Sequence, residues 1–302
     1  MNIPGIGAGS GGGWLGAGLR ALAAGLVLSL AACGDGGSGT ASRGGEAGAG
    51  GELSGRLTLT GSSTIAPLAG EIAKRFESEH PEVRIDVQTG GSSRGVADAT
   101  QGLADIGMVS RELKDGEEQL TPTTIARDGI TLIVHADNPV SELSRQQVID
   151  VYSGRVGDWS ELVEGFDGGA VTVVNKAEGR STLELFLAYF ELKNSQIQAD
   201  VVIGDNQQGI KQVAGDPAAL GYVSIGTAEY AATHGQPIKL LPMGGVAASI
   251  ASVKGGAFPL ARPLNLVTAG EPSGLVRAFL EFASSSRVND LVEGQYFVPV
   301  AD

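Results

Sequence analysis

Three short segments of the chain combine glycine with serine or threonine where a strand-like run gives way to a helix-like run. They read GSST (61–64), TGGSSRG (89–95) and KAEGRST (176–182). Glycine lets the backbone come close to a bound group, and the first turn of a helix carries unpaired N–H groups and about half a positive charge. Serine and threonine add donor hydroxyls. The segments could therefore hold a small tetrahedral oxyanion without a cage of lysines.

A single segment of this kind has a simpler interpretation, because glycine and serine also form turns that cap helices. The number of segments and their basic residues favour the anion site. Arg94 lies in the second segment, and Lys176 and Arg180 lie in the third. Taken one at a time, the segments leave both interpretations open.

Alternating strands and helices must position these segments. Strand-like runs lie at 56–60, 83–88, 105–110, 130–135, 170–175, 201–204, 221–225 and 265–268, and helix-like runs at 65–80, 95–103, 145–154, 182–192, 206–216 and 274–285. The first helix has Leu68, Ile72 and Phe76 on one face, with Ser62 or Ser63 as its expected N-cap. The alternation predicts an α/β fold with mainly parallel sheets, in which ligands bind beyond the carboxyl ends of the strands.

The composition restricts the classes of function. The chain has 302 residues, enough for about two domains, and a formal charge of −13. That charge argues against a nucleic-acid partner, because a phosphate backbone attracts an excess of lysine and arginine. The histidines His80, His135 and His234 are far apart in the sequence, and there is no Gly-x-Ser-x-Gly elbow or Walker loop. We therefore expect no enzyme, no metal and no cofactor.

The first residues indicate export. An apolar run of ten residues, ALAAGLVLSL (21–30), is too short for a membrane-spanning helix but suits a signal peptide. It leads into Leu30-Ala31-Ala32-Cys33, which resembles a bacterial lipobox. We predict a lipoprotein signal peptide at 1–33, lipidation of Cys33 and a flexible tether at 34–52. An uncleaved signal anchor and a chance cysteine are the alternatives.

Four segments resemble, in the same order, the ligand loops of the phosphate-binding proteins of bacterial ABC phosphate importers. They are GSSTIAPL (61–68), QTGGSSRG (88–95), ADIGMVSRE (104–112) and NKAEGRSTLELF (175–186). The likeness extends from about Arg56 to the end of the chain. It implies the α/β, two-lobed type II periplasmic binding protein fold, with a ligand cleft between lobes joined by two hinge strands. Lobe I would be 53–129 plus 256–302, lobe II would be 130–255, and the crossovers would lie near 127–130 and 261–266.

The resemblance also implies the residues of a phosphate site. They are Ser63, Thr64, Ile65, Ser92, Ser93, Arg94, Ser110, Lys176, Gly179, Arg180, Ser181 and Thr182. Ser110 stands where the best-known members have an aspartate that accepts the phosphate proton and other members have serine; Glu112 or Glu178 could supply an acceptor instead. In the last loop, lysine, arginine and serine replace the family's arginine, serine and glycine at 176, 180 and 181. Arg180 could bind the anion with two nitrogens or form an ion pair between the lobes.

The implied function is the capture of inorganic phosphate and its delivery to the membrane subunits of an ABC permease. The protein would be a monomer, periplasmic or otherwise extracytoplasmic in the cell envelope, and anchored to a membrane through the lipid on Cys33. Three alternatives stay open. One is a receptor for another tetrahedral oxyanion such as sulfate or molybdate. The others are a phosphatase-like enzyme and a sensor or adhesion protein on the same fold.

Overall fold

The structure, a computed structural model, describes residues 52–300. The predicted signal peptide, Cys33 and nearly all of the predicted tether lie outside the described residues. The strands are β1 (Gly55–Gly61), β2 (Val83–Thr89), β3 (Ile106–Val109), β4 (Leu120–His135), β5 (Thr172–Lys176), β6 (Val201–Ile203), β7 (Ala219–Ser224), β8 (Ile238–Leu240), β9 (Ala261–Ala269) and β10 (Val298–Pro299).

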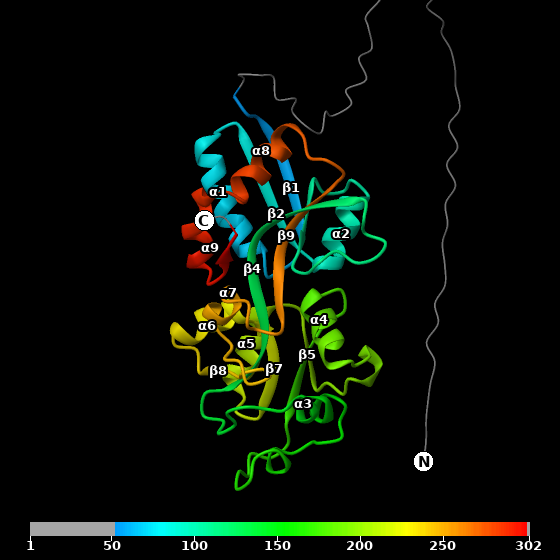
Figure 1. Ribbon diagram of the computed structural model, residues 1–302, viewed down its shortest axis with the longest axis vertical. Helices are drawn as coiled ribbons and strands as arrows, with labels where there is room; N and C mark the ends of the chain where they lie inside the picture. Colours follow the sequence, from blue (N-terminus) through cyan, green and yellow to red (C-terminus); the bar gives the residue numbers. More distant parts are fainter. Residues whose placement is uncertain (1–51, 301–302) are drawn as a thin grey trace, which may run out of the picture. The chain divides into compact units, whose positions relative to one another are not determined.

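The helices alternate with these strands along most of the chain (Figure 1). They are α1 (Ala66–Glu79), α2 (Ser92–Thr100), α3 (Arg145–Tyr152), α4 (Ser181–Phe190), α5 (Asn206–Gly215), α6 (Ile225–Thr233), α7 (Ile250–Lys254), α8 (Gly274–Ala283) and α9 (Asn289–Gly294). Within residues 52–300, no helix combines the length and the apolar character that a membrane span requires.

The first lobe is a sheet with helices on both faces. Its strands follow the order β2-β1-β3-β9-β4. The helices α1, α8 and α9 pack on one face around side chains such as Phe76, Leu266 and Phe279, whereas Ala99 of α2 packs on the other face with Val267. Leu266 and Val267 are consecutive, as the alternation of side chains along a strand requires.

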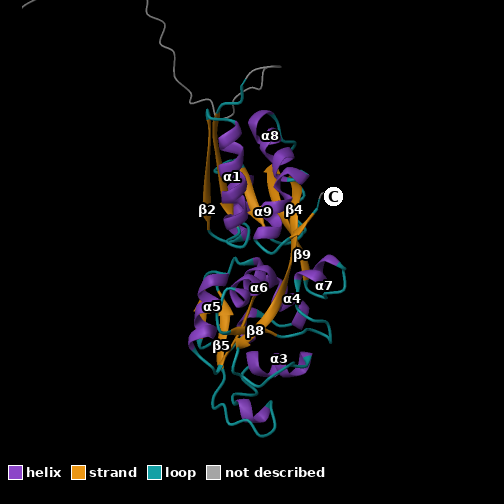
Figure 2. Ribbon diagram, turned by 90° about the vertical axis from the view of Figure 1, so that its left-hand side faces the viewer, coloured by secondary structure: helices purple, strands orange, loops and turns teal. Residues whose placement is uncertain are grey.

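The second lobe also has helices on both faces of a sheet, whose strands follow the order β4-β7-β5-β6. Figure 2, a view turned by 90° from Figure 1, shows these helices. On one face, Trp159, Phe186 of α4 and Tyr222 are among the largest fully buried side chains of the core. On the other face, α5 and α6 pack through Ile210 and Ala228. Phe186 lies on the buried apolar face of α4 with Leu183 and Phe190, as helical spacing of apolar residues predicts.

Two long strands, β4 and β9, run side by side between the lobes and are called the hinge strands below (Figure 1). They are antiparallel from the pair Leu120 and Ala269 to the pair Gly129 and Ala261. From Ile130 onward, β4 pairs with β7 of the second lobe. The lobe boundaries at 129/130 and 255/256 stay a prediction; Phe258 and Leu260 pack in the core of the second lobe.

The prediction of mainly parallel sheets is wrong. The pairs β1–β2, β1–β3, β5–β6 and β5–β7 are parallel, but both hinge strands are antiparallel to all their neighbours. Parallel neighbours in a sheet are usually joined by a helical crossover. The hinge strands run directly from one lobe to the other without such a crossover, so they need not be parallel to their neighbours.

Two helix starts also differ from expectation. The helix α2 begins at Ser92, not at residue 95, because the turn is made by Gly91 alone, with φ +94°. Most of the serine-containing segment is thus the first turn of the helix. The N-cap of α1 is Ile65, but the Ser62 hydroxyl still accepts from the backbone N–H groups of Thr64 at 3.2 Å and Ile65 at 3.4 Å.

Candidate functional site

Four buried serine hydroxyls meet between the lobes. The Ser62 hydroxyl donates to Ser110 Oγ at 2.9 Å, Ser181 Oγ lies 2.6 Å from Ser110 Oγ, and Ser92 Oγ lies 3.4 Å from it. Each of the four residues is at most 3% exposed. We call these four residues the hydroxyl cluster. It brings together three of the predicted site residues, and Ser62 is an addition to the prediction.

The fold explains why these hydroxyls meet. The strands β1 and β3 are parallel neighbours, with Gly61 paired to Met108, so the residues that follow them, Ser62 and Ser110, lie at the same edge of the sheet. The helix α2 comes close because Gly95 has no side chain. A Cβ there would lie 2.8 Å from the carbonyl oxygens of Thr60 and Met108.

The second lobe reaches the same point through the start of α4. Ser181 is the first residue of that helix, and Thr182 follows it. Both are nearly fully buried. A helix start attracts an anion because it offers its first N–H groups and a partial positive charge. Here the starts of α2 and α4, one from each lobe, flank the hydroxyl cluster.

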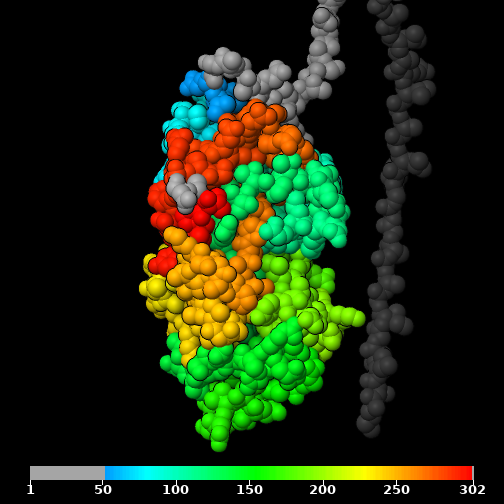
Figure 3. Space-filling view, viewed as in Figure 1, coloured from blue at the N-terminus to red at the C-terminus, as the bar shows by residue number. Residues whose placement is uncertain are grey.

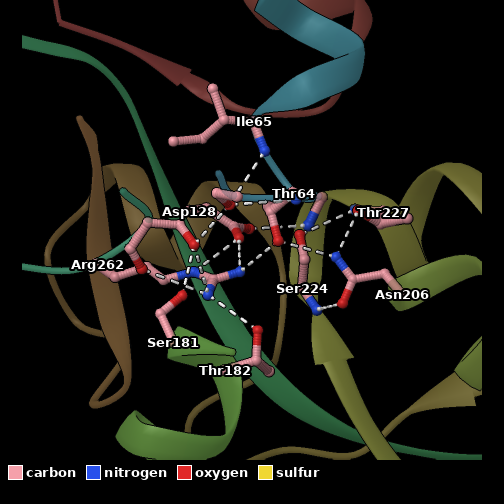
Figure 4. Close-up of polar contacts among 12 residues, drawn as sticks. Thr64, Ile65, Asp128, Ser181, Thr182, Asn206, Ser224, Thr227 and Arg262 are labelled. Carbon is pink, nitrogen blue, oxygen red and sulfur yellow. Dashed lines mark hydrogen bonds and ion pairs between the residues drawn. The ribbon is translucent and has the colours of Figure 1, made fainter. Parts of the chain in front are cut away.

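A buried arginine, Arg262 of β9, lies beside the hydroxyl cluster (Figure 4). Its Nη1 donates to Thr182 Oγ1 at 3.1 Å and to Ser110 Oγ at 3.5 Å. Its Nη2 donates to Thr64 Oγ1 at 3.4 Å. The guanidinium is held by Asp128 of β4, with 2.8 Å between Nη2 and Oδ2. It therefore contacts hydroxyls of both lobes from a hinge strand.

Neither Arg262 nor Asp128 stood out in the sequence. Both lie in the predicted crossover segments, 261–266 with one charged residue and 127–130 with two, Arg127 and Asp128. A charge inside a segment that must be buried is a usable signal, since buried charges need a partner or a function. The pairing of Asp128 with Arg262 could not be predicted, because it depends on the strand register that places the two residues opposite each other.

On the other side of Arg262, Thr64 bonds to the second lobe. Asn206, the first residue of α5, donates from Nδ2 to Thr64 Oγ1 at 3.1 Å, and Thr227 Oγ1 lies 3.5 Å from the same nitrogen. The side-chain oxygen of Asn206, Oδ1, accepts from Ser224 N at 3.4 Å. A cavity of about 390 Å³ adjoins Thr64 and Asn206 and is also lined by Ser63. Asn206 was not predicted, because an asparagine at a helix start usually serves as a cap.

The predicted lysine is buried in this part of the cleft. Lys176 Nζ donates to the carbonyl oxygen of Asp205 at 2.8 Å and to Asn206 Oδ1 at 3.1 Å. Burial lowers the pKa of Lys176 to about 7, with nearby Arg262 and Arg180 acting in the same direction and Asp205 opposing them. The cleft thus holds two buried basic side chains, Lys176 and Arg262, in a chain whose net charge is −13.

The other predicted cations are placed differently. Arg180 precedes α4, and its Nε is buried with no hydrogen-bond partner in the described part of the chain. Arg94 is exposed and pairs with Asp98 at 3.0 Å, so its side chain lies outside the hydroxyl cluster. Gly179 has φ +76°, and its carbonyl oxygen accepts from Ser93 N of the first lobe at 3.3 Å.

An ion-pair network lies at the rim, where α4 of the second lobe meets the first lobe. Glu184 of α4 accepts from Arg111 Nε at 2.8 Å, from Lys114 Nζ at 2.9 Å and from Ser93 Oγ at 3.0 Å. Figure 3 shows the surfaces of these two parts of the chain in contact. Arg111 is also held by Glu117 at 2.8 Å and is 3% exposed. These contacts join the lobes in the closed arrangement that the structure shows.

Neither of the two expected proton acceptors lies at the hydroxyl cluster. Glu112 is exposed, and Glu178 is exposed and accepts from Asn194 Nδ2 at 2.7 Å. Both oxygens of Asp128 have donors, since Oδ1 accepts from Gly226 N at 3.2 Å and Oδ2 accepts from Arg262. Across residues 52–300, there is no group of three or more His, Cys, Asp or Glu that could hold a metal ion.

Comparison with known proteins gives a consistent result. Residues 41–287 match the family described as PBP superfamily domain. The chain is 29% identical to the phosphate-binding protein PstS of Bacillus subtilis over 290 residues, which cover 94% of each chain. A phosphate-bound structure of a phosphate ABC transporter substrate-binding protein from Clostridium perfringens overlaps with a TM-score of 0.73, 28% identity and coverage of 82% and 100%. A phosphate transport receptor from Vibrio cholerae gives a TM-score of 0.67, 25% identity and coverage of 80% and 99%.

Proposed function

The chain belongs to the PBP superfamily, and from this membership we propose that it captures inorganic phosphate and delivers it to an ABC permease for import. The expected two-lobed type II periplasmic binding protein fold is confirmed by the overlap with the two transport receptors. The relatives that match over nearly the whole chain are named for phosphate binding.

One observation carries the proposal to this particular chain. Hydroxyls of both lobes meet in one buried place beside a guanidinium, with the starts of two helices around them. A tetrahedral oxyanion has several acceptor oxygens and needs donors on several sides. Ser110 and Thr64 of the first lobe and Ser181 and Thr182 of the second could supply them together only when the lobes are closed.

We propose that the ligand is bound by the residues that the resemblance implied. They are Ser63, Thr64, Ile65, Ser92, Ser93, Arg94, Ser110, Lys176, Gly179, Arg180, Ser181 and Thr182. The burial of Thr64, Ser92, Ser110, Ser181 and Thr182 at the lobe contact supports this set. For Arg94 the support is limited to its backbone in the first turn of α2, since its side chain pairs with Asp98.

We propose binding rather than catalysis. A serine nucleophile needs a general base within hydrogen-bond reach. The partners of the Ser110 hydroxyl are three other hydroxyls and a guanidinium, and none of these groups is a base at neutral pH. A chromogenic phosphate ester offered to the protein with and without divalent metal should therefore give no turnover.

The cellular setting belongs to the same proposal. The protein acts as a monomeric lipoprotein, anchored outside the cytoplasm through Cys33, and hands phosphate to the membrane subunits of the permease. Mass spectrometry of the protein from its native membrane checks the anchor, because a lipidated Cys33 adds the mass of its acyl chains to the first mature residue.

Isothermal calorimetry of the purified protein against phosphate, sulfate and molybdate tests the ligand. We expect phosphate to bind most tightly. Tighter binding of sulfate or molybdate would assign the site to another oxyanion, and no binding of any of the three would refute the transport function and favour a sensor or adhesion role.

A further inference from the structure

The charged group nearest to the hydroxyls of both lobes is not one that the resemblance supplied. Lys176 occupies the position of the family's arginine, but its Nζ is engaged by Asp205 and Asn206. Arg262 instead donates to Thr64, Ser110 and Thr182. A guanidinium presents a planar fork of donors that suits an oxyanion better than an ammonium does.

The contacts of Arg262 divide into a strong and a weak side. Toward Asp128, Nη2 and Nε donate at 2.8 and 3.1 Å. Toward the hydroxyls, the distances are 3.1 to 3.5 Å. Charge-assisted hydrogen bonds are usually about 2.7–2.9 Å long, and of these contacts only the one from Nη2 to Asp128 falls in that range. The hydroxyls, and the Ser110 backbone carbonyl oxygen at 3.5 Å from Nη1, therefore satisfy the outer edge of this guanidinium poorly. A doubly charged oxyanion is the stronger acceptor that this edge suits.

Asp128 fixes the guanidinium in that orientation. The carboxylate is fully buried, and its second oxygen accepts from the backbone N–H of Gly226 near the start of α6. Asp128 and Arg262 are opposite each other on the hinge strands. The pair is thus anchored in the part of the fold that both lobes share, and the outer edge of Arg262 faces Thr64 of one lobe and Thr182 of the other.

We propose that Arg262 is a ligand-binding residue that takes the charge of the tetrahedral oxyanion, and that Asp128 is the positioning residue that aims it from the hinge. This inference rests on the proposed function. It places the principal positive ligand on hinge strand β9 and not at Lys176, the last residue of β5, so the bound anion contacts the hinge directly. The competing explanation is that the pair only holds the two hinge strands together.

A cycle of variants separates these explanations. Arg262→Gln and Asp128→Asn each leave one buried charge without its partner, so both should lower the melting temperature. The double variant removes both charges and should recover most of that loss. Its affinity for phosphate should nevertheless stay about a hundredfold below that of the unaltered protein, the scale expected when two charge-assisted hydrogen bonds are lost. Arg262→Lys, which keeps the charge but loses the fork, should be intermediate.

Arg127→Gln is the matched control. It removes an arginine charge at the position next to Asp128 on β4. Because the Arg127 side chain is exposed, the phosphate affinity should be unchanged. Binding of phosphate by the double variant within about threefold of the unaltered protein would reduce the pair to a structural role and overturn the inference. If the unaltered protein bound sulfate but not phosphate, the proposed function would be wrong, and the sulfate affinities of the same variants would still test the role of Arg262. If it bound neither anion, both the proposed function and the role of Arg262 would be wrong.

Discussion

The hydroxyl of Ser110 lies 2.6 Å from that of Ser181, although the two residues belong to different lobes. A hydroxyl both donates and accepts, whereas an ionised carboxylate only accepts. The Ser110 hydroxyl can therefore face either a protonated or an unprotonated oxygen of a bound oxyanion. Neither Glu112 nor Glu178 lies at the cluster, so no carboxylate there accepts only the proton of phosphate. We therefore expect this protein to discriminate between phosphate and sulfate less strongly than a site with such a carboxylate would.

Replacing Ser110 with aspartate should sharpen that discrimination. A carboxylate at this position can accept the phosphate proton but repels sulfate, and like charges in contact cost several kcal/mol. The ratio of the sulfate to the phosphate dissociation constant should rise by more than about tenfold, measured by competition calorimetry at neutral pH. Ser110→Asn, of nearly the same shape but uncharged, is the control. An unchanged ratio in the aspartate variant would show that this position does not face the anion.

Glu184 should hold the closed form. It accepts from Arg111, Lys114 and Ser93 of the first lobe, and Arg111 is buried, so the pair is worth more than an exposed one. Glu184→Gln should weaken phosphate binding by about tenfold, mainly through faster release, since hydrogen bonds to charged groups contribute about 1.5–3 kcal/mol. Stopped-flow measurement of release gives the rate.

The control for this variant is Glu191→Gln, at the other end of α4, where the carboxylate pairs with Arg145 of the same lobe. It should release phosphate at the unaltered rate. Burial raises the pKa of Glu184, but Lys114, Arg111 and Ser93 lower it more, so the net shift is downward from 4.5. The contribution of Glu184 to closure should therefore be complete above pH 4.5 and be lost only as the pH falls below that value. Equal release rates of the two variants would exclude the role.

Lys176 should take up a proton when phosphate binds. Burial lowers its pKa to about 7 from an ordinary 10.5, so the unfolded chain holds more protons than the folded protein between these values and stability rises with pH across that window. A bound anion favours the charged form and raises the pKa again. At about pH 8, calorimetry in two buffers of different ionisation enthalpy should show uptake of up to about one proton per phosphate.

The variant Lys176→Met should lose this proton uptake, whereas Lys211→Met, which removes an exposed lysine from α5, should keep it. Equal uptake by the unaltered protein and the Lys176 variant would assign the proton to the phosphate itself or to another group.

Of the candidate site residues, the structure brings together those whose prediction depends on local chemistry. Ser92, Ser110, Ser181 and Thr182 lie together because each follows a strand or begins a helix, and both signals can be read from neighbouring residues. Arg262 could not be found in this way. Its role depends on the register of two strands that are more than a hundred residues apart in the chain. The same long-range pairing made the sheets mixed, where local alternation predicted mainly parallel ones.

The last prediction concerns Gly91, the N-cap of α2, whose φ is +94°. A Cβ at this position would lie 2.5 Å from the carbonyl oxygen of Gly179 in the second lobe. Gly91→Ala should therefore obstruct closure, lower the phosphate affinity by more than about tenfold and reduce the compaction seen by solution scattering on adding phosphate. Gly102→Ala, beyond the other end of α2, is the matched control. It has φ +67° and nothing within 4 Å of an added Cβ, so it also places an alanine at positive φ but without the clash. If both variants bound phosphate equally, the contact between Gly91 and Gly179 would have no part in closing the lobes over the ligand.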